Sequence, residues 1–115
     1  MDDAPLYSDR LVTLGHDAIV FHRYYLPTYQ RKVVPLSDIV DIVSEKPTFW
    51  NGKWRLHGTG TFNGGMAWFP LDFKRFRRKR IFFATLNSQR ISIGFTVENL
   101  DPFERALRNM NLLVE

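Results

Sequence analysis

The sequence predicts a mainly β fold of the α+β class, with about seven strands in two packed antiparallel sheets and one C-terminal amphipathic helix. Two observations lead to this expectation. Short runs rich in β-branched and aromatic residues recur along the chain, bounded by glycine, proline or polar turn residues. Near the C-terminus the apolar spacing changes from the period of a strand to that of a helix.

The first half of the chain predicts a meander of four antiparallel strands after a short polar leader at residues 1–9. The leader contains charged and small residues, and we expect the single domain to occupy 10–115. A turn or one helical turn is expected at Ser37-Asp38. The four strands are expected at Leu11–Leu14, Ala18–Tyr25, Arg31–Leu36 and Ile39–Val43.

Residues 46–65 differ from their surroundings and predict a long loop or hairpin. They contain five glycines and one proline. Asn51-Gly52 is typical of a two-residue hairpin turn, because both central positions need positive φ, and Asn63-Gly64 is a second candidate. Gly58-Thr59-Gly60 resembles a phosphate loop only in part, since Asn63 stands where a further glycine is needed.

A second sheet is expected from three strands after this segment. Met66–Phe73 alternates, with Trp68 on one face and Phe69 on the other. Ile81–Leu86 is apolar on both faces and predicts a central strand, and Ile91–Thr96 alternates again.

The C-terminal helix is expected at about residues 102–113. Asp101 is the expected N-cap, Pro102 suits the first helical position, and Glu104 completes a pattern similar to a capping box. One apolar face is formed by residues at helical spacing, which are Phe103, Ala106, Leu107, Met110 and Leu113.

Composition narrows the function classes. The chain has 115 residues and no cysteine, which excludes disulfides, thiol catalysis and cysteine-bound metals. Its start, MDDAPLYSDR, lacks the basic and then apolar order of a signal peptide. No apolar run approaches the roughly 20 residues that span a bilayer. We therefore expect a cytoplasmic protein, with peripheral membrane association as the alternative.

Two segments, VVPLSDIVDI (33–42) and ISIGFTVENLDPFERAL (91–107), resemble the corresponding parts of bacterial pleckstrin-homology-like (PH-like) domains. The resemblance covers roughly residues 10–113 and implies a PH-like barrel of two sheets with a C-terminal helix. It also implies a binding module for lipid, peptide or protein, without catalytic residues. Phosphoinositide-binding members carry basic residues around the first strand connection, which here is Gly15-His16-Asp17.

The strongest candidate for a binding site is the basic cluster between the fifth and sixth predicted strands. It has six positive charges in seven residues, and the rest of the chain has ten positive charges against twelve negative. The cluster is either a solvated connection or a site for an anionic ligand or membrane surface. Its charged residues are Lys74, Arg75, Arg77, Arg78, Lys79 and Arg80.

Three aromatic residues in the long loop form a second candidate contact. Phe49, Trp50 and Trp54 either pack as a satellite core or form a protruding hairpin that contacts a partner. Trp68 has the same two interpretations.

No pattern predicts an enzyme, a cofactor or a metal site. The three histidines are isolated from one another, and no serine lies in a nucleophile elbow. We therefore expect a non-enzymatic module that binds a protein partner or forms a homo-oligomer. An anionic membrane or acidic ligand at the basic cluster is the alternative. Nucleic-acid binding is less favoured, because no aromatic-bearing RNA-recognition motif is present.

Overall fold

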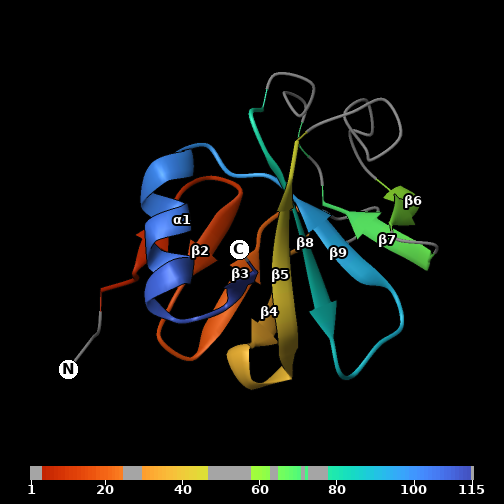
Figure 1. The fold of residues 1–115 in the computed structure, drawn as a ribbon, viewed down its shortest axis with the longest axis horizontal. Coiled ribbons are helices and arrows are strands. Elements are labelled where there is room, and N and C mark those ends of the chain that lie inside the picture. Colours follow the sequence, from red (N-terminus) through yellow and green to blue (C-terminus); the bar gives the residue numbers. More distant parts are fainter. Residues whose placement is uncertain are drawn as a thin grey trace.

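The computed structural model describes residues 4–24, 30–46, 58–62, 65–70, 72 and 78–114, with only the backbone at 58–62, 65 and 66. These residues form strands and one C-terminal helix, which lies at one side of the molecule (Figure 1). The elements are β1 (Tyr7–Ser8), β2 (Val12–Leu14), β3 (Ala18–Phe21), β4 (Lys32–Pro35), η1 (Leu36–Asp38), β5 (Ile39–Glu45), β6 (Gly58–Phe62), β7 (Gly65–Phe69), β8 (Ile81–Leu86), β9 (Ser92–Phe95), α1 (Leu100–Asn109) and β10 (Leu113–Val114).

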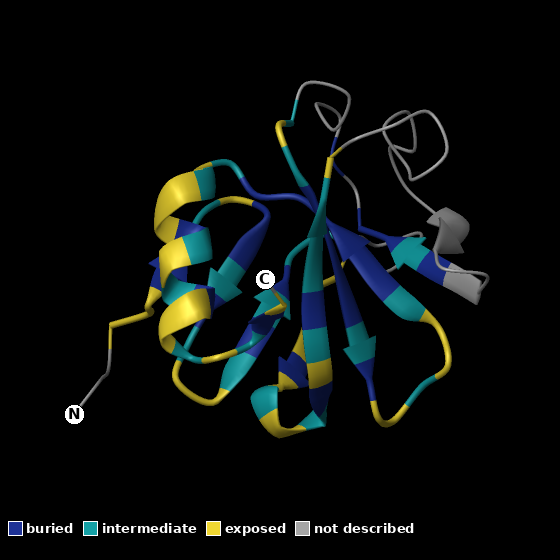
Figure 2. Ribbon diagram, in the orientation of Figure 1, coloured by how far each residue is buried: buried dark blue, intermediate teal, exposed yellow. Residues whose placement is uncertain are grey.

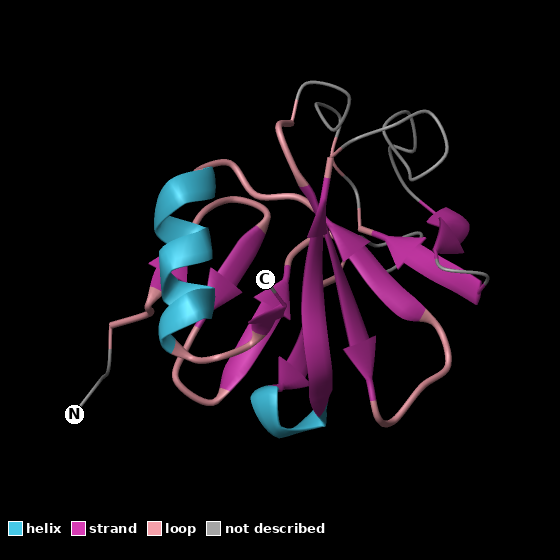
Figure 3. Ribbon diagram, in the orientation of Figure 1, coloured by secondary structure: helices cyan, strands magenta, loops and turns pink. Residues whose placement is uncertain are grey.

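The strands form two sheets, which confirms the mainly β class with a C-terminal helix (Figure 3). Sheet 1 has the order β1-β2-β3-β4 and is antiparallel throughout. Sheet 2 has the order β10-β5-β8-β9-β7-β6, with β8 in the interior as predicted. Among the described residues no strand pairs across the two sheets, so they do not close into a barrel.

The prediction of a four-strand meander is wrong for one of its four strands. The strand that begins at Ile39 belongs to sheet 2, because η1 turns the chain after Pro35 and β5 pairs with β8. The fourth strand of sheet 1 is instead β1, which pairs Tyr7 with Leu14. The end of the segment expected to be a polar leader is therefore part of the fold, and Tyr7 is buried.

The main core lies between the sheets and under α1, and Figure 2 shows buried residues along the strands of both sheets. Phe103 of α1 packs edge to face on Phe82 of β8 and on Phe95 of β9. Phe21 of sheet 1 packs on Phe95 with ring centroids 4.9 Å apart. Aromatic side chains therefore join both sheets and the helix, and each such pair adds to the free energy of burial.

Sheet 2 also has a small core on its other face, formed by Ala67, Phe69, Ile81 and Phe83. A side chain at Gly94 would disturb it, because a Cβ there would lie 2.4 Å from Cε1 of the fully buried Phe69. Glycine at this strand position lets the ring lie directly against the backbone. The alternation of Trp68 and Phe69 between the two faces is as predicted.

The helix begins and ends earlier than predicted. It starts at Leu100, so Asp101 lies inside its first turn and is not the N-cap; Asn99 holds that position without a side-chain capping bond. It ends because Asn111 adopts φ 58°, and the Leu112 N–H donates to the Leu107 carbonyl. This is a Schellman ending with asparagine in place of glycine.

The residues after the helix return to the sheet. Leu113 and Val114 form β10, which lies parallel to β5 and pairs Leu113 with Ile42. Leu113, predicted as the last apolar position of the helix, therefore fills the core from a strand. In the described part of the chain, no helix is long and apolar enough to cross a membrane.

Candidate functional site

The basic cluster leads directly into β8. Lys74, Arg75 and Arg77 lie outside the described residues, whereas Arg78, Lys79 and Arg80 lie within them. These three cations differ in what their side chains contact, and the difference decides which of them are available to a ligand.

Arg78 is part of an intramolecular ion pair. Its Nε lies 2.9 Å from Asp72 Oδ2 and its Nη2 lies 3.0 Å from Oδ1, so the pair is bidentate. The Asp72 side chain is 3% exposed and that of Arg78 is 17% exposed. The Thr96 hydroxyl also donates to Asp72. The hydrogen bonds to Asp72 raise the pKa of Arg78, which keeps the guanidinium charged beside the buried carboxylate.

Arg80 is also used within the fold. Its Nε donates to Ser44 Oγ at 2.8 Å, and its Nη2 donates to the Ser44 carbonyl at 2.9 Å. These bonds fasten the start of β8 to β5, to which it is already paired through Glu45 and Ile81. Lys79, between the two arginines, is exposed.

A cleft of about 360 Å³ lies beside these cations and includes the start of α1. Its walls contain both charge signs, because Glu98 and Asp101 line it opposite the cations. The remaining lining residues are Val97, Asn99, Leu100 and Pro102. This basic cleft (the cavity lined by Arg78–Arg80 and Val97–Pro102) therefore carries a charge close to balance, with Lys79 as its exposed cation.

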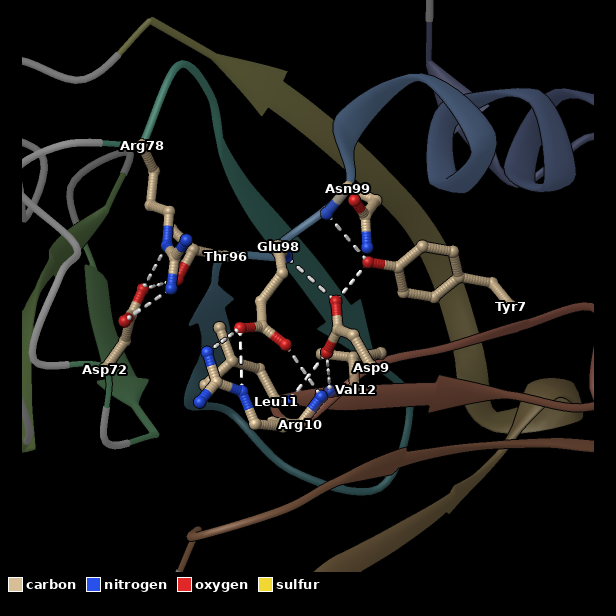
Figure 4. A network of polar contacts seen from close by, with 10 residues as sticks. All are labelled: Tyr7, Asp9, Arg10, Leu11, Val12, Asp72, Arg78, Thr96, Glu98 and Asn99. Carbon is tan, nitrogen blue, oxygen red and sulfur yellow. Dashed lines mark hydrogen bonds and ion pairs between the residues drawn. The ribbon is translucent and has the colours of Figure 1, made fainter.

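A polar network anchors the connection between β9 and α1 to the N-terminal segment (Figure 4). Asp9 Oδ1 accepts hydrogen bonds from the N–H groups of Leu11 and Val12, and Oδ2 accepts one from the N–H of Glu98. The Tyr7 hydroxyl donates to Asp9 and accepts a bond from the Asn99 N–H. Burial, together with the bond to Asp9, raises the pKa of Tyr7 well above its ordinary value.

The outer part of this network is an ion pair between Arg10 and Glu98. Arg10 Nε and its backbone N–H each donate to the Glu98 carboxylate at 2.9 Å. The Arg10 side chain is the main reason why the pKa of Glu98 lies below its ordinary value. The carboxylates and the tyrosine of this network thus join segments that are far apart in the sequence.

The aromatic loop residues Phe49, Trp50 and Trp54 lie outside the described residues. Trp68 is described, and it lines a second and larger cleft of about 530 Å³. The other lining residues are Tyr24, Lys32, Gln89, Arg90 and Ile91. This aromatic cleft (the cavity lined by those six residues) lies between β4 of sheet 1, β7 of sheet 2 and the connection between β8 and β9.

The rings of the aromatic cleft are held in place. Trp68 Nε1 donates to the Tyr24 carbonyl at 2.9 Å, and the two ring centroids are 5.9 Å apart. Lys32 Nζ lies 5.4 Å from the centroid of the Tyr24 ring, within the range of a cation–π contact. The indole, the phenol and Ile91 thus form an apolar surface that Lys32 and Arg90 border.

Sequence reasoning did not combine these residues into a site, because they come from three separate segments of the chain. One signal was available, namely the alternation that places Trp68 on the face opposite Phe69.

In the described part of the chain, no three histidine or carboxylate side chains gather so that they could hold a metal ion. Comparison of the chain with protein-family models, curated proteins and solved structures gives no match.

Proposed function

We propose that this chain is a non-enzymatic, PH-like binding module that holds a segment of a partner protein in the aromatic cleft. The observation that carries the proposal is the cleft itself, an apolar cavity of about 530 Å³ with two fixed aromatic rings. Protein sites that bind small apolar groups are concave, largely preformed and bordered by a few polar groups.

The use of the other polar residues supports a binding role over a catalytic one. Asp9, Glu98 and Asp72 are each held by hydrogen bonds that connect parts of the backbone or a buried ion pair. In contrast, the aromatic cleft exposes part of its apolar lining, since Ile91 is 36% exposed. Aromatic residues in such pockets are frequent anchors of protein contacts.

The arrangement of two sheets and a C-terminal helix supports a PH-like fold, and the aromatic cleft takes lining residues from strands of both sheets, Lys32 of β4 and Trp68 of β7. The mouths of β-barrels and the openings between packed elements are common ligand sites. A segment bound there would contact residues of both sheets.

A peptide-display selection tests the proposal. The wild-type chain is used to select from a library of random peptides, and each enriched peptide is then measured against Ile91→Asp and Leu6→Asp. Both residues are partly exposed and apolar, at 36% and 40%, but only Ile91 lines the cleft. Circular dichroism and thermal melting establish that both variants remain folded.

We expect enriched peptides that lose binding to Ile91→Asp and retain binding to Leu6→Asp. A selection that enriches no peptide, or peptides that bind both variants equally, would overturn the proposal. Light scattering over a range of concentrations adds a second outcome. Self-association that Ile91→Asp abolishes would assign the cleft to a second copy of the chain and not to a foreign partner.

A second candidate function is the binding of an anionic ligand or membrane surface at the basic cluster. The exposed Lys79 beside the basic cleft favours it, whereas the internal contacts of Arg78 and Arg80 reduce the positive charge available there. Near an anionic bilayer each accessible cation contributes about 1 kcal/mol, so the outcome depends on Lys74, Arg75, Arg77 and Lys79.

Vesicle flotation separates this candidate from the first. Anionic and neutral vesicles are compared at low salt with the wild-type chain and with a variant in which Lys74, Arg75, Arg77 and Lys79 are serine. Arg78 and Arg80 are kept, because their removal would disturb the fold. Flotation with anionic vesicles that the variant loses would support the candidate, and equal behaviour of both proteins would eliminate it.

A further inference from the structure

Sheet 1 has an unpaired edge at β4. In the order β1-β2-β3-β4, β4 pairs with β3, and among the described residues no strand lies on its other side. Val33, within this edge, is 55% exposed, the largest exposed fraction of any large apolar residue in the described part of the chain. The backbone N–H and C=O groups of such an edge are available to another strand. The outer edge of β4 is therefore a candidate surface for strand pairing.

The register between β3 and β4 determines which backbone groups face outward. The Leu36 N–H donates to the Asp17 carbonyl at 2.8 Å, and Val34 lies two positions along the same ladder. Bonded and non-bonded residue pairs alternate in an antiparallel ladder, so Val34 bonds to β3 and Val33 does not. The N–H and the C=O of Val33 therefore point away from β3, and so does the C=O of Pro35.

This edge is complementary to itself. Val33 offers both a donor and an acceptor, Pro35 offers only an acceptor, and the exposed Arg31 falls at an outward position by the same alternation. With a two-fold axis through Val33, the N–H of each Val33 donates to the C=O of the other. The Arg31 N–H of each copy then donates to the Pro35 carbonyl of the other. Proline thus stands where no N–H is needed, and Arg31 does not face a second cation.

The outer face of sheet 1 presents an uncharged row of side chains that ends at this edge. The row consists of residues that pair across the strands in register, namely Ser8, Thr13, Val20 and Val33. These residues alternate with buried ones along their strands, so they lie on the face away from the main core. A second copy would continue the row with its own Val33 and Val20. Cross-strand pairs of β-branched residues stabilise a sheet.

We propose that the chain forms a two-fold symmetric dimer in which β4 pairs with β4 of a second copy, antiparallel and centred on Val33. The pairing joins two four-stranded sheets into one. A second copy fits better than a foreign strand, because its β4 supplies the matching donors, acceptors and apolar side chain together. Each edge is used once, so assembly stops at two copies. This inference goes beyond the proposed function, since Val33 is not among the residues that line the aromatic cleft.

Analytical ultracentrifugation of the wild-type chain and three variants tests the dimer. Val33→Pro removes an N–H that does not bond to β3, so the fold tolerates it while the new pairing does not. Val33→Lys leaves the backbone unchanged but places two ammonium groups at the axis. Val33→Thr is the matched control, because it keeps both the N–H and the β-branched shape. Circular dichroism and thermal melting establish that each variant remains folded.

We expect the wild-type chain and Val33→Thr to dimerise with a dissociation constant of about 10 µM or weaker, because a short edge buries less area than a standard interface. Val33→Pro and Val33→Lys should weaken the dimer by about ten-fold or more. Amide exchange should slow at Val33 only at high concentration, whereas the Leu36 N–H, bonded to Asp17, is protected at every concentration. The chain has no cysteine, so Val33→Cys should crosslink two copies on oxidation, and the exposed Leu6→Cys should not.

The outcomes separate the dimer from the proposed function. A wild-type chain that stays monomeric up to about 500 µM would overturn the dimer and leave the aromatic cleft untouched. Self-association that Ile91→Asp abolishes and Val33→Pro does not would also overturn it, and would assign the contact to the cleft. A monomeric chain that binds selected peptides through Val33 would give this edge to a foreign strand. Failure of the peptide selection, with a dimer that depends on Val33, would overturn only the proposed function.

Discussion

The two clefts of this protein use charge in opposite ways. In the basic cleft, Arg78 is paired with the buried Asp72 and Arg80 is bonded to Ser44, so two conspicuous cations stabilise the fold. In the aromatic cleft, Lys32 and Arg90 border an apolar cavity, and no carboxylate is among its lining residues in the described part of the chain. The denser run of charge in the sequence therefore supplies two cations, Arg78 and Arg80, that are already bonded within the fold.

This difference has a physical basis. A cation beside a buried carboxylate must remain paired, since removing one partner leaves an isolated charge in a poorly solvated place. An exposed cation at the border of an open cavity, such as Arg90, is solvated and stays available to a ligand until the ligand displaces water. The number of charges in a segment is thus a poor predictor of ligand binding. The contacts that those charged side chains already make within the fold are a better one.

The largest expected effect is that of Arg78→Leu. It leaves Asp72 without its bidentate partner, and we expect a loss of about 3 kcal/mol in the free energy of unfolding, at the lower end for breaking a buried pair. Chemical denaturation measures it. The second substitution Asp72→Asn should restore part of the loss, because it removes the carboxylate charge that Arg78 neutralises. A loss below about 1 kcal/mol would mean that solvent replaces the arginine.

Arg80→Ala comes next. The substitution removes the two hydrogen bonds to Ser44, and we expect the free energy of unfolding to fall by about 1–2 kcal/mol. This loss is smaller than for a fully buried group because Arg80 is partly exposed. The matched change Lys79→Ala should alter stability by less than about 0.5 kcal/mol, as is usual for exposed positions. Equal losses of stability for Arg80→Ala and Lys79→Ala would contradict the distinction between a cation bonded within the fold and one accessible to a ligand.

Trp68→Phe tests the aromatic cleft. The smaller ring keeps an apolar wall but cannot donate to the Tyr24 carbonyl, and we expect a loss of about 1 kcal/mol in stability. Binding of selected peptides should weaken more than stability requires, since the cavity changes its shape. Thermal melting and peptide anisotropy on the same sample compare the two effects. Unchanged affinity would show that Trp68 does not contact the ligand.

The smallest expected effect is the acid sensitivity of the Arg10–Glu98 pair. The pKa of Glu98 is lowered in the folded chain, chiefly by Arg10, so its stabilising contribution is complete above the ordinary value of 4.5 and disappears as the pH falls through the lower folded value. Glu98→Gln should melt slightly earlier at neutral pH and lose less stability in acid. Thermal melts over a pH series compare the two proteins, and parallel curves would contradict this role of Glu98.

Local patterns predicted much of the fold. The apolar faces of Ile81–Leu86 predicted an interior strand, and the alternation at Ile91–Thr96 predicted its neighbour β9. The sequence pattern did not predict the exchange of strands between the sheets, because the pairing of β5 with β8 depends on contacts about forty residues apart. The end of the helix was predictable in principle, since asparagine tolerates the positive φ that Asn111 adopts.

The sites were less accessible to sequence reasoning. A run such as Lys74–Arg80 is visible at once, but nothing in it indicates that Arg78 meets Asp72 and Thr96. The aromatic cleft takes residues from β4, β7 and the β8–β9 connection, none of which is unusual by itself. Of the four aromatic residues predicted as contacts, Trp68 lines the aromatic cleft, whereas Phe49, Trp50 and Trp54 lie outside the described residues.

The fastening of the N-terminal segment has a consequence for synthesis on the ribosome. Sheet 1 is built from residues close in sequence, so its hairpins can form while the nascent chain is still short. Tyr7, Asp9 and Arg10 must wait, because their partners Glu98 and Asn99 emerge about ninety residues later. The contacts of the N-terminal segment are thus among the last to form, and Tyr7 and Asp9 remain open to chaperones and proteases until Glu98 and Asn99 have been synthesised.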